Sequence, residues 1–69
     1  MKYKIYFERD NIKPTEVTIT GEGDNCRVGS VKVNNETFLF NFQNTEENLL
    51  NTVKIKLNKF EIRKIEKID

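Results

Sequence analysis

The 69-residue sequence contains no histidine, no tryptophan, one cysteine, one proline and three glycines. Without histidine, the Ser-His and Cys-His pairs that activate a nucleophile cannot form. A single cysteine supports no disulfide framework, and no cluster of Cys and His offers a structural zinc site. Because convergent catalytic groups are missing as well, we expect that the protein is not an enzyme and needs neither a metal nor a cofactor.

Long apolar runs are missing too. No segment approaches the roughly 18 consecutive apolar residues of a membrane span. The first ten residues alternate between polar and apolar types, whereas a signal peptide has an apolar core. The sequence therefore predicts a cytoplasmic protein without a membrane partner, in which Cys26 stays reduced and packs as a small, half-buried strand residue.

A large excess of either charge is also absent. Twelve basic and eleven acidic residues give a net charge of +1, whereas proteins that neutralise phosphate groups are usually more basic. The charge is nevertheless uneven, because residues 52–69 carry six basic and three acidic side chains, and residues 1–51 carry six and eight. The basic excess fits lysines on a solvated strand face or at the edge of a sheet.

What the chain does contain is a series of short segments in which apolar and polar residues alternate, the pattern of half-buried strands. This pattern predicts strands over residues 2–8, 16–20, 26–34, 37–43 and 52–57. The core positions of the first and fourth segments are Tyr3, Ile5 and Phe7, and Phe38, Phe40 and Phe42. The three phenylalanines are expected to make the largest single contribution to the core.

Turn residues separate these segments. Residues 21–25 predict a hairpin connection, and Asn34-Asn35 predicts a tight turn, since Asn tolerates the left-handed region. The alternation changes phase between Cys26 and Val33, so we expect a β-bulge at Gly29-Ser30.

The last third of the chain leaves alternatives open. Thr45 is a candidate cap for one or two helical turns. Asn58-Lys59 fits a hairpin turn or a bulge in one long strand. The spacing of Ile62, Ile65 and Ile68 by three fits a final helical turn or an irregular edge strand.

Together these features predict a single all-β domain over residues 1–69. Five or six short, mostly antiparallel strands would form a partly open SH3-like or OB-like barrel or a small sandwich, with one short helical turn near 45–50. The likeness to such barrels is one of fold and carries no function.

One candidate binding surface is the outward face of the first and fifth predicted strands. It would combine Lys2, Lys4 and Tyr6 with Lys54 and Lys56. If these strands are neighbours, four ammonium groups surround an exposed ring, the arrangement with which sheets bind single-stranded nucleic acid. This is the alternative function that the sequence offers.

The leading hypothesis is a small non-catalytic protein that binds another protein, such as an inhibitor or accessory subunit. Small β domains offer strand edges to which a partner adds a strand, and Tyr6, Leu39 and either Ile12 or Leu50 are candidate anchors. The abundance of Asn, Lys and Ile indicates an AT-rich genome, and such proteins are typical of phages and mobile elements. Pairing of edge strands between two copies is a third possibility.

Overall fold

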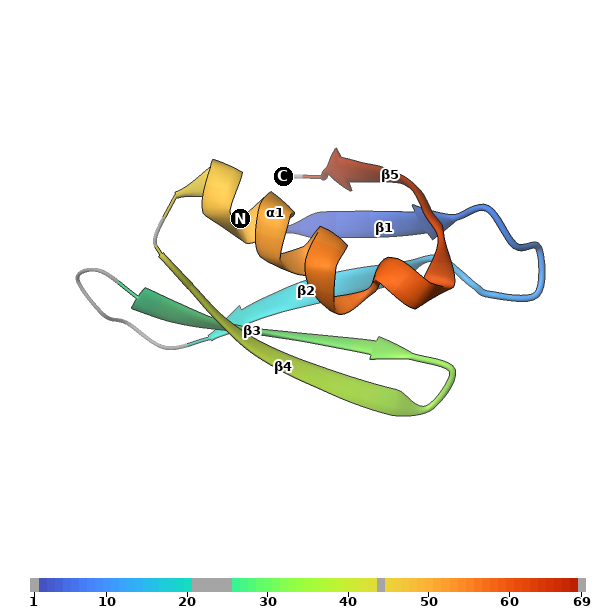
Figure 1. Ribbon diagram of the computed structural model, residues 1–69, viewed down its shortest axis with the longest axis horizontal. Coiled ribbons are helices and arrows are strands. Elements are labelled where there is room, and N and C mark those ends of the chain that lie inside the picture. Colours follow the sequence, from blue (N-terminus) through green and yellow to red (C-terminus); the bar gives the residue numbers. More distant parts are fainter. Residues whose placement is uncertain (1, 21–25, 44, 69) are drawn as a thin grey trace.

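The computed structural model describes residues 2–20, 26–43 and 45–68, which form one antiparallel sheet and two short helices (Figure 1). The elements are β1 (Tyr3–Phe7), β2 (Thr15–Thr20), β3 (Cys26–Val33), β4 (Glu36–Gln43), α1 (Glu46–Lys56), the 3-10 helix η1 (Asn58–Phe60) and β5 (Ile62–Lys67). The spatial order of the strands is β4-β3-β2-β1-β5, and the two outer strands are not paired with each other. The predicted fold class, a partly open small β fold, is confirmed. The predicted turn at 21–25 lies outside the described residues.

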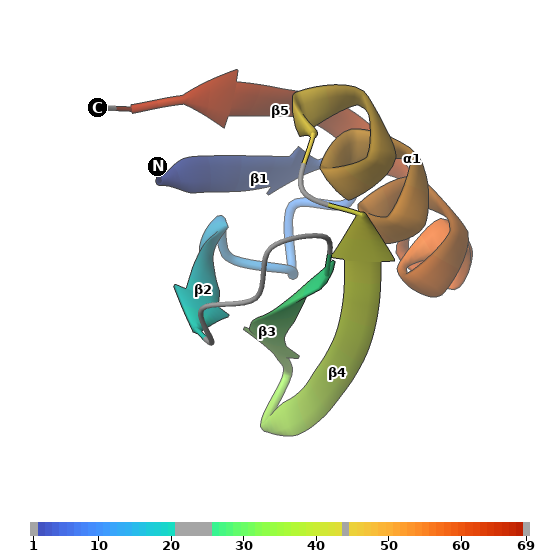
Figure 2. The same ribbon diagram turned by 90° about the vertical axis from the view of Figure 1, so that its left-hand side faces the viewer.

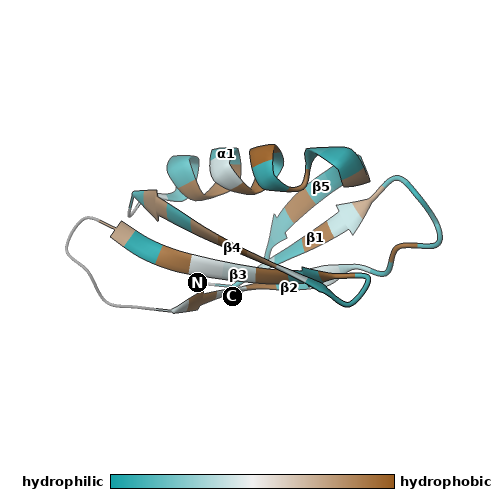
Figure 3. Cartoon of the chain, turned by 60° about the horizontal axis from the view of Figure 1, so that its bottom comes forward, coloured by the Kyte–Doolittle hydropathy of each residue, from teal (hydrophilic) through white to brown (hydrophobic). Residues whose placement is uncertain are grey.

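The sheet curls, and α1 lies between its two edges, over the enclosed face (Figure 2). This face and α1 together hold the hydrophobic core, and apolar bands recur along the strands beneath the helix (Figure 3). The buried side chains are Tyr3, Ile5, Phe7, Ile12, Val17, Val31, Val33, Phe40, Phe42, Leu49, Val53, Leu57 and Phe60. The alternation predicted for the first and fourth strands is confirmed, with Phe38 only half-buried at the end of its row.

The bulge predicted in β3 is wrong. The pairing of β3 with β4 runs without a register shift from Cys26, opposite Gln43, to Val33, opposite Glu36. Gly29 continues the inward row of β3, and a Cβ atom at that position would overlap the ring of Phe40, its cross-strand partner. The ring of Phe40 thus occupies the space that a side chain would otherwise fill, and no bulge is needed to restore the buried face.

The predicted tight turn between β3 and β4 is confirmed. Asn34 and Asn35 have φ angles of 51° and 66°. Positive φ at both central residues is the signature of the two-residue hairpin turns whose twist matches that of the strands.

The strand predicted over 52–57 is wrong, because α1 continues to Lys56. Leu49, Val53 and Leu57 recur every four residues and are all buried, whereas Ile55 is 76% exposed. The predicted cap is confirmed, since the Thr45 hydroxyl accepts a hydrogen bond from the Asn48 N–H.

The 3-10 helix η1 directs the chain from α1 into β5, so both alternatives for Asn58-Lys59 are wrong. Phe60 is buried edge-on against Phe7 and Phe38, with ring centroids 6.2 and 5.6 Å apart. Glu61 follows with a φ of 57°, a left-handed conformation that turns the backbone toward the sheet.

The last strand, β5, is an irregular edge strand, as one alternative predicted. Tyr6 lies opposite Lys64 but Phe7 lies opposite Ile62, so one extra residue is inserted in β5. This bulge allows Ile62 and Ile65, three positions apart, both to pack against the core. The helical turn proposed for this segment is therefore wrong.

Candidate functional site

The structure places Lys2, Lys4 and Tyr6 on the outer face of the sheet, opposite α1. The Nζ atoms of Lys4 and Lys64 lie 5.5 and 4.7 Å from the centroid of the Tyr6 ring, within the range of cation–π contacts. The lysine beside Tyr6 on the neighbouring strand is therefore Lys64 of β5.

The two other lysines of the predicted surface do not join it. Lys54 and Lys56 are exposed on α1, and Val53, which directly precedes Lys54, is buried in the core on the other side of the sheet. The predicted five-residue surface is thus not assembled, because the segment that carries Lys54 and Lys56 is helical.

Carboxylates are interleaved with the lysines of the outer face. Lys4 has Glu16 as its cross-strand partner on β2 and Glu66 on β5. Lys64 forms an ion pair of 3.4 Å with Glu66. The outer face is therefore nearly neutral around Tyr6, which is a poor match for a polyanion.

The proposed apolar anchors lie apart from one another. Leu39 is 64% exposed on β4, three strands away from Tyr6 on β1. Ile12 belongs to the core at 5% exposure, so it is not available as an anchor. Leu50 is half-buried on α1 and faces a groove that the sequence did not reveal.

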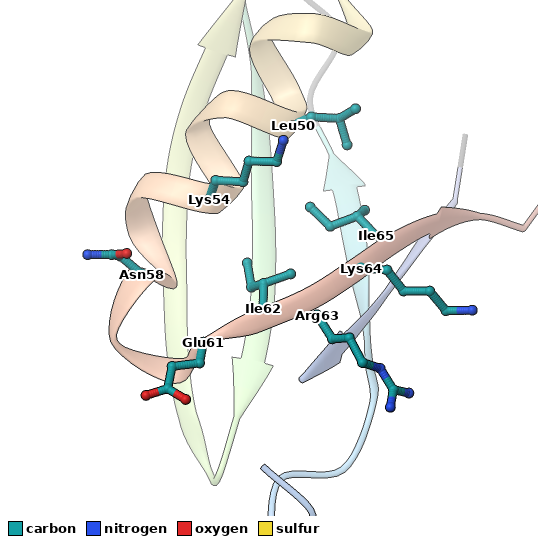
Figure 4. A pocket seen from close by; sticks show the side chains of 8 residues that line it. All are labelled: Leu50, Lys54, Asn58, Glu61, Ile62, Arg63, Lys64 and Ile65. Atoms are coloured by element: carbon teal, nitrogen blue, oxygen red, sulfur yellow. The ribbon is translucent and has the colours of Figure 1, made fainter. Parts of the chain in front are cut away.

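That groove lies between α1 and β5 and has a volume of about 500 Å³. Its lining residues are Leu50, Lys54, Asn58, Glu61, Ile62, Arg63, Lys64 and Ile65. The side chains of Ile62 and Ile65 point from β5 toward α1, and Leu50 and Lys54 face them from the helix (Figure 4). Three half-buried aliphatic side chains thus form the apolar part of the groove, whereas Arg63 and Lys64 point from β5 away from α1 (Figure 4).

The open edge of β5 runs along the same groove. The N–H of Ile68 donates to the carbonyl oxygen of Lys2 at 3.0 Å. Backbone groups in an antiparallel pair point alternately toward and away from the neighbouring strand. Ile65 and Lys67 therefore turn their N–H and C=O groups away from β1, toward the side where none of the described residues forms a further strand.

The charges around the groove are predominantly positive and largely uncompensated. Glu61 pairs with Arg9 at 3.6 Å, and Lys64 pairs with Glu66. Within the described part of the chain, Lys54, Arg63 and Lys67 have no carboxylate within ion-pair distance. Three of the six basic residues noted for residues 52–69 line this groove, namely Lys54, Arg63 and Lys64. The basic excess is the one signal through which the sequence pointed to it.

Comparisons with known proteins add no assignment, since no family model, curated protein or solved structure matches the chain. No helix among the described residues is long and apolar enough to span a membrane.

Proposed function

We propose that the chain is a small non-catalytic binding protein that acts through protein–protein contact at the groove between α1 and β5. The observation that carries this proposal is the coincidence of an open strand edge with an apolar hollow. Strand addition uses both, since the free N–H and C=O groups bind a partner's backbone and the hollow receives one of its side chains.

The role that fits such a protein is that of an inhibitor or accessory subunit of the kind phages and mobile elements encode. A chain of 69 residues with a net charge of +1 can act by covering a surface of a larger protein. Mixed charge suits a protein partner better than a polyanion.

Capture from a lysate of the source cells tests the proposal when the open edge is blocked selectively. Lys67→Pro removes an N–H that points away from β1, a position where an edge strand tolerates proline. Lys67→Ala removes the same side chain but keeps the N–H, so it is the matched control. We expect the wild type and Lys67→Ala to retain a protein partner after nuclease treatment, and Lys67→Pro to lose it. The proposal fails if the wild type retains no protein, or if all three retain it equally.

A second candidate function is the binding of single-stranded nucleic acid at Tyr6, favoured by the ammonium groups of Lys4 and Lys64 beside its ring. Fluorescence anisotropy with a labelled single strand tests it. Affinity should fall steeply with salt and should weaken in Lys64→Glu. Unchanged affinity in that variant excludes this surface.

A further inference from the structure

The two edge strands of the sheet, β4 and β5, differ in how open they are to pairing with a strand of a partner. β4 is regular over eight residues, and α1 packs against it. β5 is shorter, carries a bulge, and borders the groove. We therefore expect an extended chain that binds beside the groove to pair with β5 and not with β4.

A second copy of this strand is a poor occupant. Antiparallel pairing of two β5 strands about Ile65 would place Arg63 of each copy beside Lys67 of the other, although it would also place Lys64 beside Glu66. Like charges directly opposite each other in a sheet are destabilising. Lysine and a bulge at an edge are, in addition, the usual features that discourage pairing between copies.

The same charges favour a partner of the opposite sign. Lys54 lines the groove on α1 and Arg63 on β5, and Lys67 lies further along β5, two residues after the lining residue Ile65. All three are without a carboxylate partner among the described residues. Their charge is exposed, so it steers an acidic segment and selects among partners more than it adds affinity.

We propose that the groove binds an extended acidic segment of another protein, added to the sheet as a sixth strand along β5. This inference rests on the proposed function and names the chemistry of the partner. An apolar side chain of the segment occupies the hollow between Leu50, Ile62 and Ile65. Acidic side chains lie on either side of it, near Lys54 and Lys67.

The geometry of a strand sets the spacing of these side chains. Alternate residues of an extended chain share one face and lie about 7 Å apart. The segment therefore has one apolar residue, with Asp or Glu two positions before it and two positions after it. The intervening residues face the outer side of the sheet and are less restricted.

A synthetic peptide of this pattern, acetyl-Thr-Asp-Thr-Ile-Thr-Asp-Thr-amide, is the probe. Titrated into isotope-labelled protein at low ionic strength, it should shift the backbone amide NMR signals of Leu50, Ile65 and Lys67. A peptide with Lys in place of both Asp residues should bind at least tenfold more weakly, since it reverses two charges at the rim.

Two lysines on α1 provide a matched pair of variants. Both are exposed, but Lys54 lines the groove and Lys56 does not. Lys54→Glu should weaken binding of the acidic peptide about threefold to tenfold, and Lys56→Glu should change it by less than about twofold. Lys67→Pro should abolish the shift of the Ile65 amide signal.

Three outcomes overturn the inference. They are the absence of any shift with the acidic peptide, equal binding of the lysine peptide, and tighter binding of a single-stranded oligonucleotide at the same amides. In each case, lysate capture that depends on the open edge of β5 would still support the proposed function. If the acidic peptide does not bind and lysate capture does not depend on the open edge of β5, the proposed function fails as well.

Discussion

Gly29 and Phe40 show how one missing side chain sets the local packing of the sheet. The two residues are cross-strand partners on β3 and β4, and both are buried. The ring covers the glycine so closely that no Cβ atom fits between them. In the sequence, the glycine interrupts an alternating apolar pattern. Only the pairing of the strands shows that a ring from the neighbouring strand occupies the space that its side chain would take.

Gly29→Ala should lower the free energy of unfolding by about 1–3 kcal/mol, because the new methyl group forces Phe40 out of its position. Chemical denaturation measures the loss. Ser30→Ala is the control at the next position on the outer face, and its effect should stay within about 0.5 kcal/mol. If both variants had the same stability, the close contact of Gly29 with Phe40 would be refuted.

At the scale of elements, strands that pack one face on the core were predictable, whereas only the start of the helix was, from the Thr45 cap. β1 alternates with a period of two over its whole length, which admits a single interpretation. In residues 52–57, by contrast, Val53, Ile55 and Leu57 match a strand while Val53 and Leu57 also match a helix. The helix is favoured because Leu49, one turn earlier, extends the same buried row and because α1 covers the apolar face of the sheet.

Substitutions at Leu49 and Ile55 distinguish these two interpretations in the protein itself. Leu49→Ala should lower the free energy of unfolding by about 2–5 kcal/mol, because the Leu49 side chain is fully buried between α1 and the sheet. Ile55→Ala should change it by less than about 0.5 kcal/mol, since the side chain is exposed. Comparable losses at the two positions, measured by urea denaturation, would contradict the helical arrangement.

The start of α1 depends on a small network of polar groups. The Thr45 hydroxyl accepts from the N–H of Asn48 at 3.2 Å and from its side-chain amide at 2.8 Å. That amide also donates to the Gln43 side chain at 3.2 Å, which joins the helix to the end of β4. Thr45→Ala should therefore cost about 1 kcal/mol of stability, with Thr45→Ser close to the wild type. A Thr45→Ala variant as stable as the wild type in thermal denaturation would contradict this role.

At the scale of the whole molecule, the candidate site could be predicted only in part. The excess of basic residues after position 51 is visible in the sequence, but the groove arises where α1 and β5 approach each other. Leu50 and Ile65 come together because the chain turns at η1 and then pairs with β1, its first strand. Contacts of this kind join distant parts of the chain, and no local pattern specifies them.

Shared burial also determines how the molecule unfolds. The core joins residues of β1 to β4 and of both helices, and Ile62 and Ile65 of β5 pack against it. Tyr3 of β1 and Leu49 of α1 belong to the same buried cluster, and Phe60 of η1 packs on Phe7 of β1. Neither the sheet nor the helix can lose the other without exposing this cluster to water, so we expect a single cooperative transition.

Two signals measured during one urea titration test this expectation. Since the chain has no tryptophan, its fluorescence emission comes from Tyr3 and Tyr6, both on β1. Helices dominate the circular dichroism signal near 222 nm, so that signal follows mainly α1. The two curves should share one midpoint, and Leu49→Ala should move both midpoints to lower urea by the same amount. A helical signal lost at lower urea than the tyrosine signal would show that α1 detaches from an intact sheet, and the groove between α1 and β5 would then exist only while the helix is docked.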